Sequence, residues 1–308
     1  MNLRKVSLCL ALALAATPAR AGDCRLKQFA SLDVLENKAG AIVPATIQGR
    51  SGAYLQLELN DIVSAVSDGV VRQYGLQRDA VRKGVSIGIE GQQIRDMTKL
   101  DIGLGSATVK ADAAVVPDYP AGDPRVVGHL AMDALSRYDV ELDLAHGKLN
   151  LFSHDHCKGE VVYWTTTAPV AEVPMDVRGD LEFVIPVQLD GKPLNAELSA
   201  EPGAALNGKV ASDEFGLENA PGPHTFKAIS MAGLSIANPT LEIYPDDSRG
   251  CNGGAQVRPG EVFTPRDLQM ERCYGHPDLT LGLPQLKRLR IFMAFQERTL
   301  YVTAASAN

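Results

Sequence analysis

Acidic residues lie where an apolar run of the sequence ends. The stretch YLQLELNDIVSAVS, residues 54–67, alternates apolar and polar residues as a strand does, and a turn is expected at Glu58, Leu59, Asn60 and Asp61. A carboxylate at a strand end can act as a general acid or base, or it can accept backbone hydrogen bonds in an ordinary turn. These residues leave both interpretations open until a second copy of the segment is found.

Two other groups of residues could do chemistry. Ser199 could be a nucleophile, but the chain has no G-x-S-x-G elbow and the nearest downstream histidine is His224. Because catalytic triads are defined by geometry, a serine hydrolase stays possible, and we favour a turn serine. Residues 154–157, His-Asp-His-Cys, resemble metal ligands in composition, but alternate histidines of a strand point to opposite faces. We predict an exposed linker there, and no metal or cofactor.

Two glycine-rich stretches have simpler interpretations. Gly103-Leu104-Gly105 lacks the third glycine and the following helix of a dinucleotide-binding loop, so a β-turn is predicted. The loop GCNGGAQVRPGE, residues 250–261, either borders a binding cleft or forms a long surface loop.

Three further acids, Asp61, Asp133 and Glu201, are candidates for a catalytic acid that is displaced from the strand end. We favour turn or helix-cap roles for them.

The first 21 residues resemble a secretory signal peptide, with Arg4 and Lys5, an apolar run, and a small-x-small site ending at Ala21. The apolar run is too short to span a membrane, so we expect an exported protein, periplasmic or secreted, without membrane insertion after cleavage. The chain has 30 basic and 37 acidic residues and a formal charge of −7, which loss of the leader changes to about −10. This balance disfavours nucleic acid as a partner.

Four cysteines remain after the leader. In an oxidising compartment an even number favours two disulfides, and three connectivities are possible. We predict Cys251–Cys273, which share one loop region, and Cys24–Cys157, which would tie the mature N-terminus to the end of the first half.

The chain contains an internal repeat. Residues 130–151 align without a gap with residues 281–302 at a shift of 151, which pairs Leu130 with Leu281 and Arg137 with Arg288. Upstream, residues 47–76 resemble residues 188–217 at a shift of 141, with one extra residue in the first hairpin. The repeat predicts two similar units, 22–155 and 160–304, joined near residues 153–160.

Both units consist mainly of period-two apolar runs broken by Gly or Pro, which predict β-hairpins. Helical spacing is confined to short pieces at residues 68–74, 131–137 and 284–289. The prediction is an all-β protein of two closed lobes, with one short helix after the closing turn of each lobe.

The order of these elements resembles the retropepsin-like aspartic protease family. The closing segments LAMDALSRYDVELDLAHGKLNLF and LTLGLPQLKRLRIFMAFQERTLYVT carry the likeness, which is nearest to bacterial exported members with two lobes in one chain and extends over residues 41–303. The resemblance implies an acid-protease fold with an inter-lobe cleft. In this family each lobe supplies an Asp-Thr-Gly turn, and the two Asp share one proton because like charges about 3 Å apart do not both ionise.

Both family motifs have changed in this chain. The resemblance places Glu58-Leu59-Asn60 and Ser199-Ala200-Glu201 at the two turns, so neither Asp is present. Glu58 keeps a carboxyl, but a serine hydroxyl does not ionise in a useful range. The glycine that lies beneath the family's catalytic turn is kept at Gly282, whereas the first lobe has Ala131.

The sequence therefore favours a non-catalytic pseudoprotease that binds a peptide or protein in the cleft, by strand addition for example. An active endopeptidase that pairs Glu58 with a displaced carboxylate such as Glu201 is the alternative. A third hypothesis is a structural or assembly role with an unused cleft.

Overall fold

The structure, a computed structural model, describes residues 25–82, 87–89, 92–117, 123–178, 182–218, 220–244 and 277–306. Strands account for 53% of the described residues and helices for 10%, so the prediction of a mostly β protein is confirmed. The predicted signal peptide, Cys24, the 250–261 loop and Cys273 lie outside the described residues, and the cysteine pairings stay predictions.

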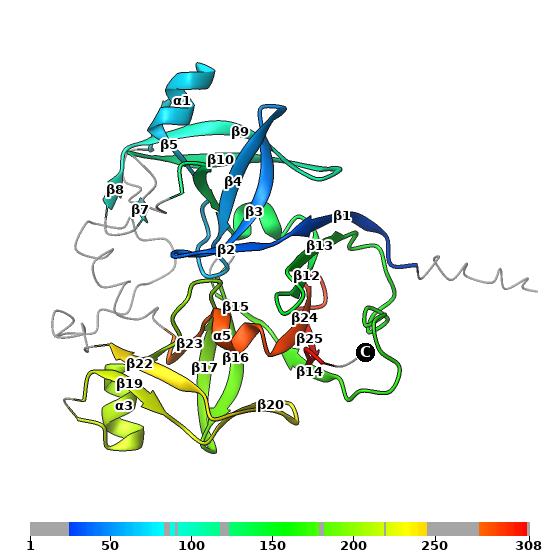
Figure 1. Ribbon diagram of the computed structural model, residues 1–308, viewed down its shortest axis with the longest axis vertical. Coiled ribbons are helices and arrows are strands. Elements are labelled where there is room, and N and C mark those ends of the chain that lie inside the picture. Colours follow the sequence, from blue (N-terminus) through cyan, green and yellow to red (C-terminus); the bar gives the residue numbers. More distant parts are fainter. Residues whose placement is uncertain are drawn as a thin grey trace, which may run out of the picture.

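The first half of the chain forms an eight-stranded sheet, here called the first-half sheet (Figure 1). In sheet order its strands are β2 (Leu35–Asn37), β3 (Gly40–Ile47), β4 (Arg50–Leu57), β11 (Val126–Leu130), β5 (Ala65–Ser67), β10 (Ala107–Val116), β9 (Asp96–Leu104) and β6 (Asp79–Ala80). A further pairing of β3 with β9 closes this sheet into a barrel. The strands β7 (Ile87–Ile89) and β8 (Gln92–Ile94) form a separate hairpin.

The second half forms a nine-stranded sheet, the second-half sheet. In order its strands are β19 (Gly222–Thr225), β22 (Thr240–Tyr244), β18 (Ala205–Asn207), β23 (Leu279–Leu281), β17 (Lys192–Leu198), β16 (Glu182–Leu189), β20 (Ala228–Met231) and β21 (Leu234–Ala237), and β15 (Asp176–Arg178) pairs with β16. Figure 1 shows the two sheets at opposite ends of the molecule.

A third sheet, the shared sheet, contains strands from both halves. Its order is β1 (Gln28–Asp33), β13 (Lys148–Phe152), β12 (Asp139–Asp143), β24 (Leu289–Ala294), β25 (Thr299–Ala304) and β14 (Ala171–Pro174). The central pair is symmetric, because Val140 lies opposite Met293 while Leu142 lies opposite Ile291. At a shift of 151 residues Val140 corresponds to Ile291, and Leu142 corresponds to Met293, so each pair is the repeat counterpart of the other. The sequence repeat therefore corresponds to a pseudo-twofold arrangement of the strands.

The opening hairpins of the two halves have the same turn. Gln48 and Gly49 have φ of 51° and 74°, and Asp190 and Gly191 have φ of 49° and 83°. Two consecutive residues at positive φ define a type I′ turn, whose twist matches that of the strands it joins. The turns are 142 residues apart, which accounts for the extra residue that the sequence alignment required in this hairpin.

Four described helices pack against the sheets. Helix α1 (Asp68–Tyr74) was predicted with these bounds, and the helices α2 (Met132–Leu135) and α5 (Leu283–Leu286) are shorter than predicted. Helix α3 (Gly208–Phe215) was missed, although the helices predicted after the two closing turns are present as α2 and α5. Its signals were the N-cap Asn207, whose side chain accepts from two backbone N–H groups, and the left-handed C-cap Gly216.

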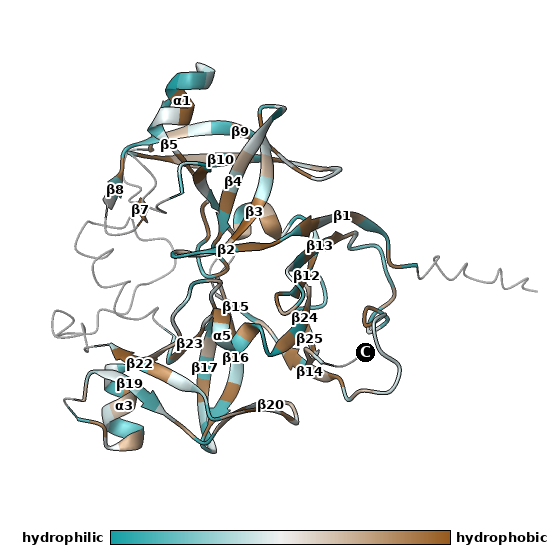
Figure 2. Cartoon of the chain, viewed as in Figure 1, coloured by the Kyte–Doolittle hydropathy of each residue, from teal (hydrophilic) through white to brown (hydrophobic). Residues whose placement is uncertain are grey.

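One apolar core extends through both halves. The side chains of Ile47, Leu55, Leu130, Leu206 and Leu281 are all completely buried in it. Each contributes about 1.5–3 kcal/mol to folding. Figure 2 shows the mixed hydropathy of α1, whose buried residues contact β5. The core is therefore continuous between the two halves.

Candidate functional site

Glu58 and Ser199 occupy equivalent backbone positions. Each follows the last residue of a long hairpin strand, β4 or β17, and that strand pairs in parallel with β11 or β23. The N–H of Glu58 donates to Leu130 O at 3.0 Å, and the N–H of Ser199 donates to Leu281 O at 2.9 Å. The structural repeat therefore makes these two residues counterparts of each other, as the sequence repeat does.

The two turns differ in length by one residue. The carbonyl oxygen of Asp61 accepts from Met132 N at 3.0 Å, and that of Glu201 accepts from Leu283 N at 2.8 Å. Because Met132 and Leu283 begin equivalent helices, Asp61 is the structural counterpart of Glu201. The sequence alignment had put Asn60 there, and the extra residue of the first turn could not be located from the sequence.

The carboxylate of Glu58 is tied to its own strand. Glu58 is half-buried, and its Oε1 accepts from Gln56 Nε2 at 2.6 Å. Gln56 is 3% exposed and also lies 3.3 Å from Ala39 O. A buried amide thus holds the Glu58 side chain beside the end of β4.

Ser199 stabilises the second turn. Its side chain is completely buried, and its Oγ accepts from Glu201 N at 3.2 Å. A serine hydroxyl that accepts from the backbone N–H two residues on is a common turn-stabilising arrangement. This contact supports the turn-serine interpretation, while His224 lies against Ala220 O at 2.9 Å.

The second turn also contacts the first half of the chain. Ala41 N donates to Ala200 O at 3.0 Å. Gly40, at φ 137°, approaches so closely that a Cβ there would lie 2.5 Å from Ala200 O. A side chain at Gly40 is therefore excluded by both conformation and space, and the two halves meet at the turn that contains Ser199.

A polar contact crosses the halves beside the turns. Asn60 Nδ2 lies 3.4 Å from Glu197 Oε1, which also accepts from Thr280 Oγ1 at 2.8 Å. Glu197 is the repeat counterpart of Gln56, so equivalent positions carry an acid in one half and an amide in the other. Glu201 lies at the exposed end of the second turn.

Gly282 is required by close packing. A Cβ on Gly282 would lie 1.7 Å from Gly203 O and 2.4 Å from Gly203 C. In the first half Ala131 is accommodated, and its N–H donates to Ser64 Oγ at 3.0 Å.

Asp133, one of the candidate acids, is hydrogen-bonded to Ser64, the serine that also accepts from Ala131 N. Its Oδ1 accepts from Ser64 Oγ at 2.6 Å and from Ser64 N at 3.0 Å. Burial raises the pKa of the Asp133 carboxyl, and the hydrogen bonds from Ser64 oppose this rise. Asp61 accepts from Ile62 N and Val63 N, as a turn aspartate does.

The predicted exposed linker instead carries a buried histidine. His154 Nδ1 lies 2.8 Å from Asp139 Oδ1, and His156 Nε2 lies 2.5 Å from Asp139 Oδ2. The His156 side chain is 3% exposed and also lies 3.4 Å from Glu297 Oε1. The segment is not a strand, so its alternate histidines reach the same carboxylate. Among the described residues no group of three or more His, Cys, Asp or Glu could hold a metal ion.

A second buried acid, Glu141, lies on the same face of the shared sheet. It is completely buried and accepts from Tyr163 Oη at 2.5 Å, from Asn150 Nδ2 at 3.1 Å and from Arg290 Nε at 2.7 Å. The Arg290 guanidinium stacks over the Trp164 ring at 4.5 Å. Asp139 and Glu141 alternate with apolar residues along β12, and the chain after β13 covers the face on which they lie.

Two tyrosines of this region should ionise at unusually high pH. Burial, followed by a hydrogen bond to a carboxylate, raises the pKa of Tyr163 beside Glu141 and that of Tyr301 beside Glu297. Because the folded state holds both protons more tightly, the free energy of unfolding should fall as the pH rises above about 10, the unfolded value. In a titration of phenolate absorbance, Tyr163→Phe and Tyr301→Phe should each remove only a late component.

Tyr244 supplies the control for this titration. It is 59% exposed and belongs to neither tyrosine–carboxylate pair, so Tyr244→Phe should leave the late components of Tyr163 and Tyr301 unchanged. Loss of an ordinary component in Tyr163→Phe would show that Tyr163 does not donate to a carboxylate in solution.

In the described part of the chain no helix is long and apolar enough to span a membrane.

No family model matches the chain, and no curated protein matches its sequence. Among solved structures, the chain is similar to basic 7S globulin from soybean, a plant protein with a pepsin-like fold, with a TM-score of 0.53 and 13% identity. The similarity covers 92% of this chain and 96% of the globulin chain. At this identity it shows the fold alone.

Proposed function

We propose that this chain is a catalytically inactive relative of the two-lobed aspartic proteases, and that it binds an extended peptide or protein segment between its halves. We further propose that it acts after export, in the periplasm or outside the cell. The pepsin-like fold of its structural neighbour supports the architecture. The side chains at the two turns support the loss of catalysis.

The observation that carries the proposal is that Glu58 and Ser199 occupy equivalent positions in the two halves. Their equivalent N–H···O bonds place a carboxyl at one turn and a hydroxyl at the other. Aspartic-protease chemistry needs two carboxyls that share one proton, so that one activates water while the other donates to the substrate. A buried hydroxyl that already accepts from Glu201 N is a poor replacement.

The surroundings of the turns are suited to binding. Asn60 and Glu201 are exposed polar residues, and Ile62 is an apolar side chain that is 43% exposed. Extended peptides commonly bind through backbone hydrogen bonds, with alternate side chains in apolar contacts. Ile62 is therefore the candidate apolar contact for a bound peptide.

The first test is cleavage of an unbiased peptide library by the mature protein and by Glu58→Gln, from acid to neutral pH. We expect no cleavage by either protein. The amide keeps an oxygen that can accept from Gln56, so this variant should fold. Cuts that are made by the wild type and vanish in Glu58→Gln would overturn the proposal and favour an endopeptidase that pairs Glu58 with a displaced carboxylate such as Glu201.

The second test is selection of binding peptides from the same library. We expect Ile62→Asp to weaken selected peptides about tenfold or more, because it replaces an apolar contact by a charge. Val170→Asp is the matched control, since Val170 is 39% exposed and directly precedes β14, the edge strand of the shared sheet. Equal affinities in the two variants, or no selected peptide, would remove the peptide-binding part of the proposal.

A further inference from the structure

A cavity lies behind the second turn, on the side of helix α5. Its volume is about 380 Å³, and it is bounded by the residues after Glu201, by α5 and by the start of β22. This volume lies within the range of about 300–1,000 Å³ that is usual for small-molecule sites. Three prolines, Pro202, Pro239 and Pro284, supply rigid apolar surface.

Gln285 in the wall of this cavity has an unsatisfied buried oxygen. The residue is 5% exposed, and its Nε2 makes a long contact of 3.4 Å with Thr240 O. Within the described part of the chain, its Oε1 has no hydrogen-bond partner. A buried acceptor without a donor costs about 1–3 kcal/mol. A ligand donor that met this oxygen would therefore be stabilised, and because the oxygen is buried, the Gln285 side chain must turn toward the cavity to meet it.

The internal repeat shows that packing does not require this amide. The counterpart of Gln285 at a shift of 151 is Ala134, which is completely buried. The counterparts of Ala204 and Pro284 are Ser64 and Asp133, whose hydrogen bond of 2.6 Å bridges the same place in the first half. The second half replaces that bridge by two residues that cannot form it.

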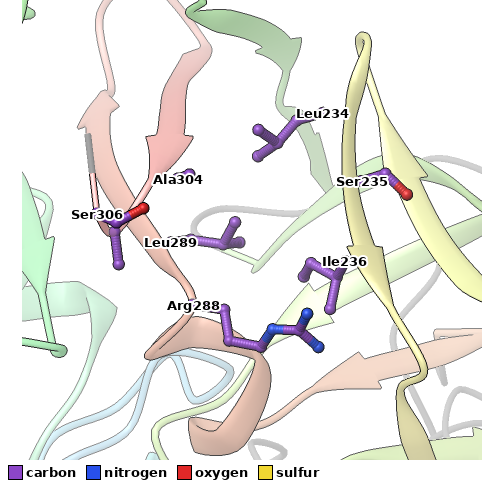
Figure 3. A pocket seen from close by; sticks show the side chains of 8 residues that line it. Leu234, Ser235, Ile236, Arg288, Leu289, Ala304 and Ser306 are labelled. Carbon is purple, nitrogen blue, oxygen red and sulfur yellow. The ribbon is translucent and has the colours of Figure 1, made fainter. Parts of the chain in front are cut away.

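Both signs of charge border the cavity. Arg288 donates through Nη1 to Ala237 O at 2.6 Å, and a guanidinium has further N–H donors for an anion. Glu242 lines the same cavity with an exposed side chain. Arg288 also lines a neighbouring cavity of about 350 Å³, where Figure 3 shows its side chain extending from the end of α5 toward Ile236.

We propose that this cavity binds a small zwitterion, an α-amino acid with both termini free. The carboxylate binds Arg288, the ammonium group binds Glu242 and donates to Gln285 Oε1, and the prolines contact the side chain. Each of these contacts matches a group of opposite charge or hydrogen-bonding character. The site lies on the α5 side of the second turn, and it does not depend on the peptide-binding function proposed above.

The test is thermal unfolding of the mature protein with each of the twenty L-amino acids at millimolar concentration, followed by calorimetric titration. We expect at least one amino acid to raise Tm by about 2–4 °C, because a ligand that binds only the folded state stabilises it. Its N-acetyl and amide derivatives should bind at least tenfold more weakly. No shift with any amino acid, or equal binding of the blocked derivatives, would overturn the proposal.

Two variants locate the site. Gln285→Leu removes the unsatisfied oxygen, so its Tm without ligand should equal or exceed that of the wild type, while its affinity falls at least tenfold. Arg288→Gln should also weaken binding, and Arg137→Gln, at the repeat counterpart, should not. An amino acid that stabilises the wild type and Gln285→Leu equally would contradict this assignment.

Discussion

Replacement of Gly282 by alanine should lower the free energy of unfolding by about 3–5 kcal/mol, at the upper end of single-substitution effects. The added Cβ would lie 1.7 Å from Gly203 O, and the atoms it meets all belong to the backbone. A backbone carbonyl cannot rotate away as a flexible side chain can. The second turn must therefore move, and the hydrogen bond from Leu283 N to Glu201 O should be strained as well. Urea unfolding monitored by circular dichroism measures the effect.

Gly69 provides the matched control for this substitution. It lies in helix α1, and a Cβ there would be 3.8 Å from Ser67 Oγ, an ordinary contact. Gly69→Ala should therefore stabilise the protein by about 0.5–1 kcal/mol, because alanine loses less conformational freedom than glycine in a helix. A loss of less than about 1 kcal/mol in Gly282→Ala would mean that the turn next to Ser199 is free to shift.

Replacement of Arg290 by methionine should cost about 3–5 kcal/mol, because Glu141 would remain buried without its cation. Arg290 Nη2 lies 2.6 Å from Glu141 Oε1, and their side chains are 15% and 0% exposed. The pair joins β24 of the second half to β12 of the first half. Loss of the guanidinium should therefore weaken the shared sheet where the two halves meet. Chemical denaturation again gives the free energy.

Lys148→Met tests whether burial causes this loss. Lys148 lies on β13 of the same sheet and pairs with Asp33 at 2.6 Å, but the side chains are 45% and 75% exposed. Such a surface pair contributes less than about 1 kcal/mol. The double substitution Glu141→Gln with Arg290→Met should recover part of the loss by removing the buried charge. Similar losses in Arg290→Met and Lys148→Met would contradict the description of Glu141 as a buried carboxylate.

Prediction from sequence succeeded for elements whose signals lie within short segments of the chain. The hairpins and helix α1 were predicted from the spacing of apolar residues and from the Gly or Pro that interrupts it, and the structure adds a type I′ turn and helix caps as further local signals. These signals act over a few residues, so they can be read without knowledge of distant partners. Helix α3 carried the same kind of signal between Asn207 and Gly216, and comparison with α1 through the repeat would have found it.

The candidate site was predictable only in part. The shift of 141 residues aligned Glu58 with Ser199, and their equivalent hydrogen bonds to Leu130 and Leu281 agree with that alignment. The one-residue difference between the turns was not visible, because either of two adjacent residues could have been the insertion. Only the contacts to Met132 and Leu283 show that Asp61 corresponds to Glu201.

By itself the sequence determined that this is a repeated, mostly β chain in which a glutamate and a serine hold equivalent strand-end positions, because periodicity and turn residues are properties of short segments. The tertiary structure alone decided that the acids of β12 are buried, that His156 contacts one of them, and that Gln285 Oε1 lacks a donor among the described residues. Burial and hydrogen bonding depend on partners far along the chain, such as Arg290, which lies 149 residues from Glu141. Local pattern carries no information about such partners until the sheets assemble.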